Sequence, residues 1–151
     1  MNSQKSVKSK NFRSPIHKAE LNILFTGNWL FEKVTALLKP YGISEQQYHV
    51  LKILKGKKGI PVNLQYLNDR MIYKMSNTTR LVEKLRLGEY LERSLCEHNR
   101  RMVEITITEE GLELLEFLDP LVDSQLKSSF DNLTRNEAEM LSSLLEKLRD
   151  D

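Results

Sequence analysis

Residues 75–107 read MSNTTRLVEKLRLGEYLERSLCEHNRRMVEITI, and this stretch decides the fold. Up to Leu87 its apolar residues recur every three or four positions, which is the spacing of an amphipathic helix. After Gly88, a residue suited to ending a helix, the period changes to two. Residues 91–95 and 103–107 then alternate as two half-buried strands around a polar tip. The stretch therefore predicts a helix followed directly by a β-hairpin.

Two shorter helices are expected before this stretch. Ser44 and Gln47 form a capping-box pattern at the start of the first helix, which ends at the glycine-containing turn 56–59. Asn63 suits the N-cap of the second helix, over about residues 64–70. This second helix, a tight turn and the next helix make a helix-turn-helix, and the hairpin after it completes a winged helix.

A long helix is predicted before this module. Ser14 and Pro15 give its start signal, a cap hydroxyl followed by proline at the first helical position. Its apolar residues recur at helical spacing until a break at residues 40–42. Gly27 in the middle is unfavourable for a helix, so we expect a backbone to pack closely against it.

Two more helices are predicted after the hairpin. Thr108 is expected to cap a helix that runs to about residue 129 and is interrupted and kinked at Pro120. A capping box at residues 134–137 begins the last helix. These helices and the N-terminal one are each too apolar on one face to stand alone. A partner chain is the simplest way to cover them.

The composition is close to that of an average soluble protein, with 40% hydrophobic and 29% charged side chains among 151 residues. The longest apolar run is far below the about 20 residues that a membrane span needs. The N-terminus lacks the apolar stretch of a secretory signal, and the single cysteine, Cys96, excludes an intramolecular disulfide. We therefore expect a cytoplasmic protein without contact to a membrane.

The net charge of +2 hides a strong asymmetry along the chain. Residues 1–51 carry +4, residues 52–101 carry +7 and residues 102–151 carry −9. A basic middle beside an acidic end suggests that one module meets a polyanion. On charge alone, two oppositely charged solvated faces are an equally good explanation.

The helix that ends before Gly88 has two contrasting faces. On a helical wheel Thr78, Leu81, Val82 and Leu85 fall on one side and are expected to pack inward. Side chains on the opposite side suit a DNA groove, because amide and guanidinium groups bond base edges while hydroxyls and lysine hold phosphates. An ordinary solvated face is the alternative, although the position between a turn and a hairpin disfavours it. The polar face comprises Ser76, Asn77, Arg80 and Lys84, with Thr79 and Glu83 at its edge.

The tip of the hairpin ends in two consecutive arginines. Arg100 and Arg101 could reach phosphates or enter a minor groove, whose negative potential attracts guanidinium groups. The alternative is that Arg101 pairs with a carboxylate of its own domain. The basic turn at residues 55–58 could add phosphate contacts, but a solvated turn is equally compatible with it.

Several pieces of the sequence share their order and spacing with one family. They are ISEQQYHVL at 43–51, TRLVEKL at 79–85, NRR at 99–101, ITEEG at 107–111 and LTRNE at 133–137. Together they resemble the MarR family (multiple-antibiotic-resistance regulators), which are winged-helix bacterial transcription factors. The resemblance covers nearly the whole chain after the N-terminal tail.

The resemblance implies a homodimer on double-stranded DNA. Two winged domains would bind a pseudo-palindromic operator with half-sites about one DNA turn apart. Arg101 would be the wing arginine, and the polar face described above would belong to the recognition helix. Most members of the family are repressors that are released by a small phenolic or other ligand, which implies the same for this chain.

The resemblance also divides the chain into parts within a fold class that is mainly α with a small β-hairpin wing. Residues 1–13 would be a flexible basic tail, 14–40 the N-terminal dimerisation helix, 41–108 the DNA-binding domain and 109–151 the C-terminal dimerisation helices. The helices of two chains would interlock through apolar residues. Those expected at the contact are Ile16, Ile23, Phe130, Leu141, Leu144, Leu145 and Leu148.

Three positions depart from the family pattern. Asn99 stands where the wing usually has Asp, so a neutral amide replaces an acid that would orient an arginine. Ile72 replaces the turn glycine and Lys74 replaces the usual N-cap serine. These two changes predict a turn that is tilted or longer than in the family.

Candidates for other kinds of site are few. Phe25, Trp29 and Tyr48 could form the walls of a pocket for a small aromatic ligand, although bulky residues at helical spacing are more often core. Cys96 lies at the base of the wing, which does not favour redox sensing, and with His98 it makes only half a metal site. We expect neither a metal nor a cofactor.

Two other classes of function compete with a DNA-binding regulator. A winged-helix module could instead bind an acidic protein partner through its basic face, and salt-sensitive binding to DNA would distinguish the two. An enzyme is disfavoured because the sequence shows no nucleophile–base arrangement, paired carboxylate site or Gly-rich phosphate loop. The sequence therefore predicts a dimeric DNA-binding regulator without catalytic residues.

Overall fold

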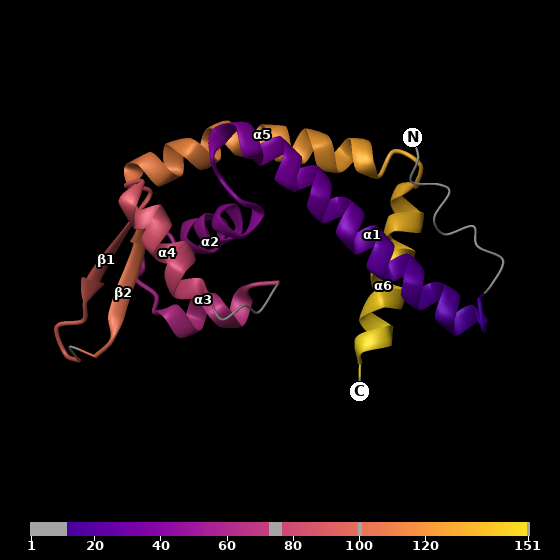
Figure 1. Cartoon of the computed structure of the whole chain (residues 1–151), viewed down its shortest axis with the longest axis horizontal. Coiled ribbons are helices and arrows are strands. Elements are labelled where there is room, and N and C mark those ends of the chain that lie inside the picture. Colours follow the sequence, from indigo (N-terminus) through magenta and orange to yellow (C-terminus); the bar gives the residue numbers. More distant parts are fainter. Residues whose placement is uncertain (1–11, 73–76, 100, 151) are drawn as a thin grey trace.

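The computed structural model describes residues 12–72, 77–99 and 101–150 (Figure 1). It confirms a mainly helical fold with a two-stranded antiparallel hairpin. None of the helices in the described part is long and apolar enough to cross a membrane. The elements are α1 (Pro15–Leu38), the 3-10 helix η1 (Lys39–Tyr41), α2 (Glu45–Gly56), α3 (Leu64–Arg70), α4 (Thr78–Leu87), β1 (Leu91–Leu95), β2 (Val103–Ile107), α5 (Glu109–Ser129) and α6 (Arg135–Arg149).

Caps that the sequence predicts define most of the helix starts. The capping boxes at residues 44–47 and 134–137 are both formed, which confirms the starts of α2 and α6. Ser14, Asn63 and Thr108 cap α1, α3 and α5, each accepting a backbone N–H three residues ahead. Because each of these caps satisfies a donor that the helix leaves free, the boundaries follow from local chemistry.

The long helices differ from expectation at two positions. α5 runs without interruption through Pro120, because the buried side chains of Leu115 and Leu118 hold the preceding turns against the core. In α1, a Cβ added at Gly27 would meet nothing within 4 Å in this chain. The close backbone contact expected at Gly27 is therefore wrong within a single chain.

The start of α4 also differs from the expected one. α4 begins at Thr78 instead of about residue 75, and its N-cap, Asn77, makes no side-chain capping hydrogen bond. Lys74 and Ser76, which figured in the predicted turn and polar face, lie outside the described residues. So do Arg100 and the tail up to residue 11.

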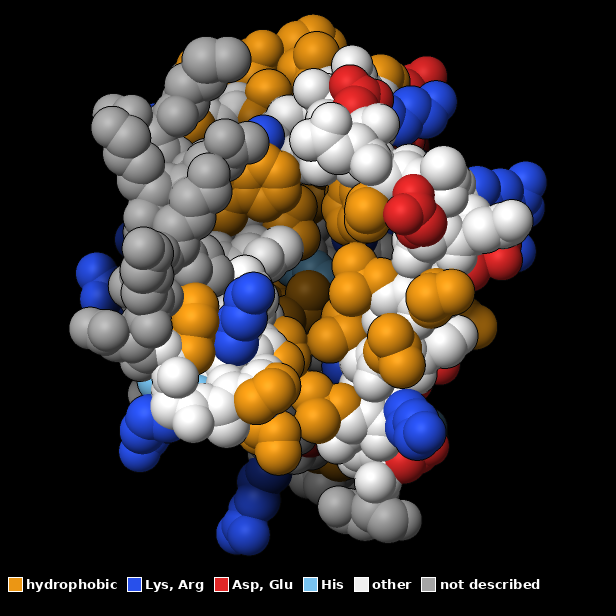
Figure 2. Space-filling model, turned by 90° about the vertical axis from the view of Figure 1, so that its right-hand side faces the viewer, with side chains coloured by type: hydrophobic (Ala, Val, Ile, Leu, Met, Phe, Trp, Pro, Cys, Tyr) orange, Lys and Arg blue, Asp and Glu red, His pale blue; other side chains and the backbone are white. Residues whose placement is uncertain are grey.

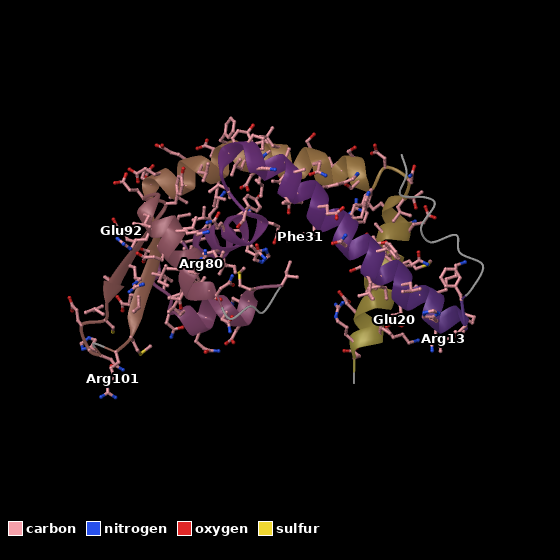
Figure 3. The ribbon with its side chains drawn as sticks, viewed as in Figure 1. Arg13, Glu20, Phe31, Arg80, Glu92 and Arg101 are labelled. Atoms are coloured by element: carbon pink, nitrogen blue, oxygen red, sulfur yellow. The ribbon has the colours of Figure 1, made fainter. Side chains whose placement is uncertain are left out.

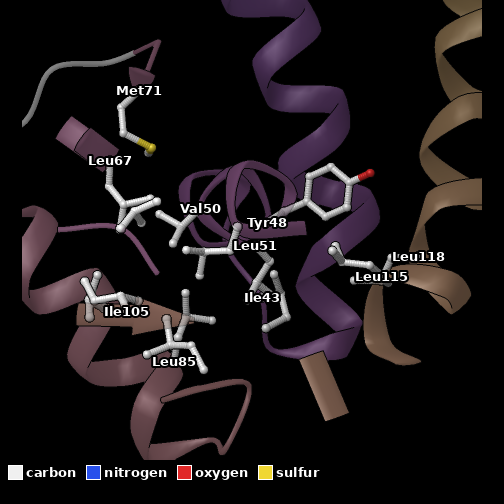
Figure 4. Packing of buried hydrophobic residues seen from close by; sticks show 14 of the residues in the cluster. Ile43, Tyr48, Val50, Leu51, Leu67, Met71, Leu85, Ile105, Leu115 and Leu118 are labelled. Atoms are coloured by element: carbon white, nitrogen blue, oxygen red, sulfur yellow. The ribbon is translucent and has the colours of Figure 1, made fainter. Parts of the chain in front are cut away.

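The hydrophobic core lies where α2, α3, α4, the hairpin and α5 meet (Figure 4). The predicted inward face of α4 is confirmed, because Thr78, Val82 and Leu85 are buried and Leu81 is half-buried. The largest fully buried side chains of this core include Leu51, Leu54, Leu67, Leu85, Leu91, Ile105, Leu115 and Leu118.

The two strands of the hairpin pair antiparallel. β2 is half-buried as the alternating pattern predicts, but β1 is not, because only Leu91 is buried and residues 92–95 are exposed. Leu91 pairs with Ile107, and Arg93 pairs with Ile105. Backbone hydrogen bonds of 2.8 and 3.0 Å join Ile105 to Val62, so the segment between α2 and α3 extends the sheet on the other side of β2. The hairpin, called the wing below together with its tip, is therefore anchored to the helix-turn-helix.

The elements form an arch in Figure 1. α5 runs across the top, and α1 contacts it there and then descends to the other end of the arch. The winged helix-turn-helix occupies one end, and α6 with the first turns of α1 occupies the other. The basic middle of the sequence therefore lies at one end of the arch, and the apolar faces of α6 and of the start of α1 lie at the other.

Candidate nucleic-acid interface

A cleft of about 680 Å³ lies between α4 and the first strand of the wing. Every side chain that lines it is polar, and three of them are cationic. It brings together four of the residues predicted for DNA binding, and their binding to DNA stays a prediction. The lining consists of Asn77, Thr79, Arg80, Glu83, Lys84 and Arg93.

The inward face of α4 positions this polar surface. Val82 and Leu85 are buried in the core, which turns Thr79, Arg80 and Lys84 to the outside. Near the start of the helix, the hydroxyl of Thr78 donates a hydrogen bond of 3.1 Å to the side-chain oxygen of Asn68 on α3. This hydrogen bond joins the start of α4 to α3, the two helices of the helix-turn-helix.

Asn77 stands at the entrance to α4 with an unused acceptor. Its side-chain oxygen is buried and has no hydrogen-bond partner among the described residues. A buried acceptor without a donor costs about 1–3 kcal/mol until a donor reaches it.

The cations of the cleft differ in their partners. Arg80 and Lys84 make no ion pair with any residue of the described part of the chain. Arg93 lies 3.6 Å from Glu83, and Arg86 binds Glu83 through two hydrogen bonds of 2.6 and 3.0 Å. The hydrogen bonds from Arg86 lower the pKa of Glu83, so this carboxylate is ionised beside the cations. With three cations and one carboxylate, the lining has a net positive charge.

Sequence reasoning missed Arg93. The alternation of the strand marked it as one of the residues on the Leu91 face, and charge along the chain did not distinguish it from other cations. Its place in the cleft depends on the packing of β1 against α4, which no local pattern records. The available signal was its place in the alternating pattern, on the same face as Leu91, and in the structure it pairs with the fully buried Ile105.

The wing tip presents Arg101 to the outside. The side-chain oxygen of Asn99 accepts a hydrogen bond of 3.1 Å from the backbone N–H of Arg101, and the Asn99 carbonyl accepts one from Met102. The amide that replaces the usual acid therefore orders the backbone that carries the arginine. Arg101 is exposed, points away from the molecule (Figure 3) and pairs with no carboxylate in the described part of the chain.

The lysines in and before the basic turn at residues 55–58 have partners within the chain. Lys55, together with Lys52 one turn earlier, binds Asp119 of α5 at 3.3 and 3.0 Å. Lys57 lies 5.1 Å from the ring centre of Tyr66. These lysines are therefore partly engaged within the chain instead of being open to phosphates.

A second, apolar site lies at the opposite end of the arch. A cavity of about 440 Å³ opens between α1, α6 and the end of α5, and Trp29, Phe130 and Leu145 are among its walls. Figure 2 views the molecule from this end and shows hydrophobic side chains around a hollow. Exposed apolar side chains gathered around a hollow are typical of an interaction site.

The residues predicted for dimerisation gather at this end. Phe130 and Leu145 line the cavity together with Ile23 and Leu141. Five of the seven predicted residues also expose much of their side chains in the single chain. The exposed fractions are 82% for Ile16, 40% for Ile23, 40% for Leu141, 58% for Leu144 and 67% for Leu148.

The three candidates for a small-ligand pocket lie apart. Trp29 lines the apolar cavity, with the ammonium group of Lys33 4.0 Å from its ring centre. Tyr48 is buried in the core of the winged domain, and Phe25 is exposed on α1. The structure therefore does not bring these aromatic residues together.

The structure also describes Cys96 and His98, the half of a metal site that the sequence offers. Across residues 12–72, 77–99 and 101–150, no group of three or more His, Cys, Asp or Glu side chains could hold a metal ion. Cys96 is a free, half-buried thiol.

The chain is similar in sequence to regulators with a helix-turn-helix. It is 29% identical over 108 residues to the HTH-type transcriptional regulator PapX of Escherichia coli, covering 72% of this chain and 66% of PapX. It is 28% identical over 108 residues to MhqR of Bacillus subtilis, covering 72% and 73%. The transcriptional repressor MprA of E. coli is 25% identical over 119 residues, covering 79% and 68%. No family model matches the chain.

Solved structures show the same fold. A MarR transcription factor from Planctomyces limnophilus is 26% identical, with a TM-score of 0.71, over 90% of this chain and 98% of that one. A variant of E. coli MarR complexed with operator DNA has a TM-score of 0.80 at 23% identity, over 94% and 100%. BpsR of Bordetella bronchiseptica, whose DNA binding is regulated by 6-hydroxynicotinic acid, has a TM-score of 0.78 at 20% identity, over 87% and 93%.

The relatives matched by sequence and by structure are of one class of protein. Those matched by sequence are named as transcriptional regulators instead of enzymes, in agreement with the expected lack of catalytic activity. The matched structures share the helices and hairpin over nearly their whole length. By sequence and fold together, the chain is similar to winged-helix transcriptional regulators of the MarR family.

Proposed function

We propose that the chain forms a homodimer that binds a pseudo-palindromic operator and represses transcription until a small molecule releases it. The observation that carries this proposal is the cationic cleft, in which Arg80 and Lys84 stand on the outer face of a helix next to the wing. Such a helix fits the major groove of B-DNA, where side chains can reach base edges. The site for double-stranded DNA would comprise Ser76, Asn77, Thr79, Arg80, Lys84, Arg100 and Arg101.

The wing extends the same surface. Arg80 and Arg101 lie at the same end of the molecule in Figure 3, with the tip arginine beyond the end of the hairpin. A guanidinium group at that position can enter a neighbouring minor groove or bind phosphates. The MarR variant with the same fold, solved with operator DNA, supports this mode of binding.

A second copy of the chain would cover the apolar end. Leu144 and Leu148 on α6 and Ile16 on α1 expose large apolar side chains near the cavity that opens between these helices. Burying such surface stabilises an association by roughly 25 cal/mol per Å² before the costs of ordering. A symmetric pair would present two α4 helices, and the half-sites of the operator would lie about one DNA turn apart.

Two relatives support the finer parts of the proposal. MprA is named as a transcriptional repressor, and the DNA binding of BpsR is regulated by the small aromatic acid 6-hydroxynicotinic acid. By analogy, a small aromatic ligand would shift this chain to a state that binds its operator less tightly. Such a regulator acts in the cytoplasm, where bacterial DNA is found.

Fluorescence anisotropy with labelled duplexes tests the function. The duplexes are the DNA upstream of the protein's own gene and a scrambled sequence of the same length, each measured at several salt concentrations. We expect affinity for both to fall steeply with salt, with tighter binding to the upstream duplex. Asn77→Ala should reduce this preference more than it reduces affinity for the scrambled duplex.

The alternative partner gives the opposite result. A protein that ignores both duplexes at low ionic strength but binds an acidic polypeptide such as polyglutamate would contradict the DNA-binding proposal. Equal losses on both duplexes for Asn77→Ala would show that Asn77 does not contribute to base preference.

A further inference from the structure

The cleft between α4 and the wing contains an acid that DNA binding alone does not explain. Glu83 lies among Arg80, Lys84 and Arg93, which line the same cleft. A carboxylate at this place repels the phosphates that the three cations attract. The contacts of Glu83 with Arg86 and Arg93 indicate a structural role for this carboxylate.

Glu83 joins the recognition helix to the wing. Its Oε1 and Oε2 accept hydrogen bonds of 2.6 and 3.0 Å from Nη2 and Nε of Arg86, on its own helix. The same Oε2 lies 3.6 Å from Nη1 of Arg93, on β1. One carboxylate therefore connects α4 with the first strand of the wing, with Arg86 holding the carboxylate in place.

The backbone that carries Arg93 is fixed. Arg93 pairs with Ile105, which is fully buried and is hydrogen-bonded on its other side to Val62. The Arg93 side chain keeps 37% of its surface exposed and lines the cleft. Because a guanidinium group has five N–H donors, the contact with Glu83 leaves donors for a second acceptor.

The geometry of B-DNA indicates what that acceptor is. The sugar-phosphate backbone separates the major groove from the neighbouring minor groove. A protein with α4 in the major groove and the wing tip in the minor groove must straddle this backbone. The cleft between α4 and β1 is the space in which a backbone phosphate would then lie, with Lys84 on one side and Arg93 on the other.

We propose that Arg93 contacts a backbone phosphate of DNA in this cleft and that Glu83 is the residue that positions Arg93 for it. This inference rests on the proposed function and adds to it a fixed spacing between the recognition helix and the wing. Arg93 contributes the positive charge that attracts the phosphate, whereas Glu83 holds the Arg93 side chain in position. Removal of each should therefore have a different effect.

Anisotropy on the upstream and scrambled duplexes separates the two roles. Arg93→Gln should weaken binding to both duplexes and reduce the slope of log affinity against log salt by about 0.9, the value for one phosphate contact. Glu83→Gln should leave the slope intact, because Arg93 is still charged. It should lower the preference for the upstream duplex by up to about fivefold, the range of a partly exposed ion pair.

Matched controls exclude effects of net charge and of folding. Arg135→Gln removes an equally charged side chain that is paired with Glu139 on α6, and it should leave slope and preference unchanged. Arg93→Lys keeps the charge and should keep the slope, but it should lose preference because an ammonium group cannot bridge two acceptors in the same way. Thermal unfolding of every variant shows whether it is folded.

A double variant tests whether Glu83 acts through Arg93. In the Arg93→Gln background, Glu83→Gln should not change the preference further. A further loss of preference there, or a wild-type slope for Arg93→Gln, would overturn the inference while leaving the proposed function standing. If the wild-type protein shows no salt-sensitive binding to either duplex, the proposed function fails first.

Discussion

The hydroxyl of Tyr48 on α2 donates a hydrogen bond of 2.5 Å to Oδ1 of Asp119 on α5. The other carboxylate oxygen accepts from Lys52 at 3.0 Å and from Lys55 at 3.3 Å. Three donors from one helix of the winged domain thus converge on a single acid of the helix that crosses the arch. Burial and this hydrogen bond raise the pKa of Tyr48 well above its usual value, so the hydroxyl is always the donor at neutral pH.

Loss of the Asp119 charge should destabilise the protein in a pH-dependent way. Burial by itself would raise the pKa of Asp119, but the hydrogen bonds from Tyr48, Lys52 and Lys55 lower it overall. The charged form therefore stabilises the fold above the unfolded-state pKa of about 3.9, and this contribution is lost as pH falls through the lower folded-state pKa. Asp119→Asn should lower the free energy of unfolding by about 1–2 kcal/mol at pH 7.

Urea unfolding at pH 7 and at pH 3 measures this effect. The difference between wild type and Asp119→Asn should shrink at the lower pH, where the wild-type carboxyl is increasingly protonated. Asp123→Asn, one turn further along the exposed side of α5, is the control and should change little. An equal loss at both pH values would mean that the charge of Asp119 is not what stabilises the contact.

Gly111 should tolerate no side chain. A Cβ there would lie 2.2 Å from the carbonyl oxygen of Tyr90 and 2.7 Å from Cγ1 of Ile107, where the hairpin meets α5. Since one of these neighbours is backbone, Gly111→Ala should cost roughly 2 kcal/mol of stability in thermal or urea unfolding. Gly56→Ala, where a Cβ meets nothing within 4 Å, should be close to neutral, and similar losses for both would refute the packing argument.

Arg101 should contribute to affinity independently of DNA sequence. Its exposed position at the wing tip makes it a candidate for one phosphate or minor-groove contact. Arg101→Ala should weaken binding to upstream and scrambled duplexes by similar factors and reduce the salt slope by about 0.9. The control is Arg13→Ala, which removes a cation at the other end of the molecule (Figure 3). Unchanged binding by Arg101→Ala would remove the wing from the interface.

The apolar face of α6 should be needed for dimerisation. Leu144 is 58% exposed in the single chain, so Leu144→Glu should leave the fold of one chain intact while placing a charge in the contact between two. Light scattering should give twice the chain mass of 17.7 kDa for wild type and the single mass for the variant. Ser143→Glu, which lies about 100° away from Leu144 around the helix, should remain a dimer. A wild-type monomer at working concentration would contradict the proposal.

The sequence predicted most of the fold because its signals are local. Capping hydroxyls such as Ser44 and Thr134 bond donors three residues away, and the change of period after Gly88 reports the hairpin directly. The polar face of α4 was predictable for the same reason, since a helical wheel needs only the spacing of residues. The uninterrupted course of α5 through Pro120 was not, because packing on the core overrides the local preference.

The contacts that sequence reasoning missed join residues of different elements. Tyr48 and Asp119 are 71 positions apart, and neither lies in a motif that names the other. Glu83 and Arg93 belong to different elements, so their pairing appears only when β1 is packed against α4. Gly27 gave a wrong prediction of a contact. Glycine is unfavourable within a helix, but no close backbone contact compensates for it inside one chain.

Selection of DNA fragments by the purified protein, followed by sequencing, tests the central claim most directly. If two chains place their recognition helices in successive turns of one duplex, the enriched fragments should share an inverted repeat with half-sites about 10 base pairs apart, centre to centre. Enrichment of a single unrepeated motif, or no enrichment at low salt, would contradict the account.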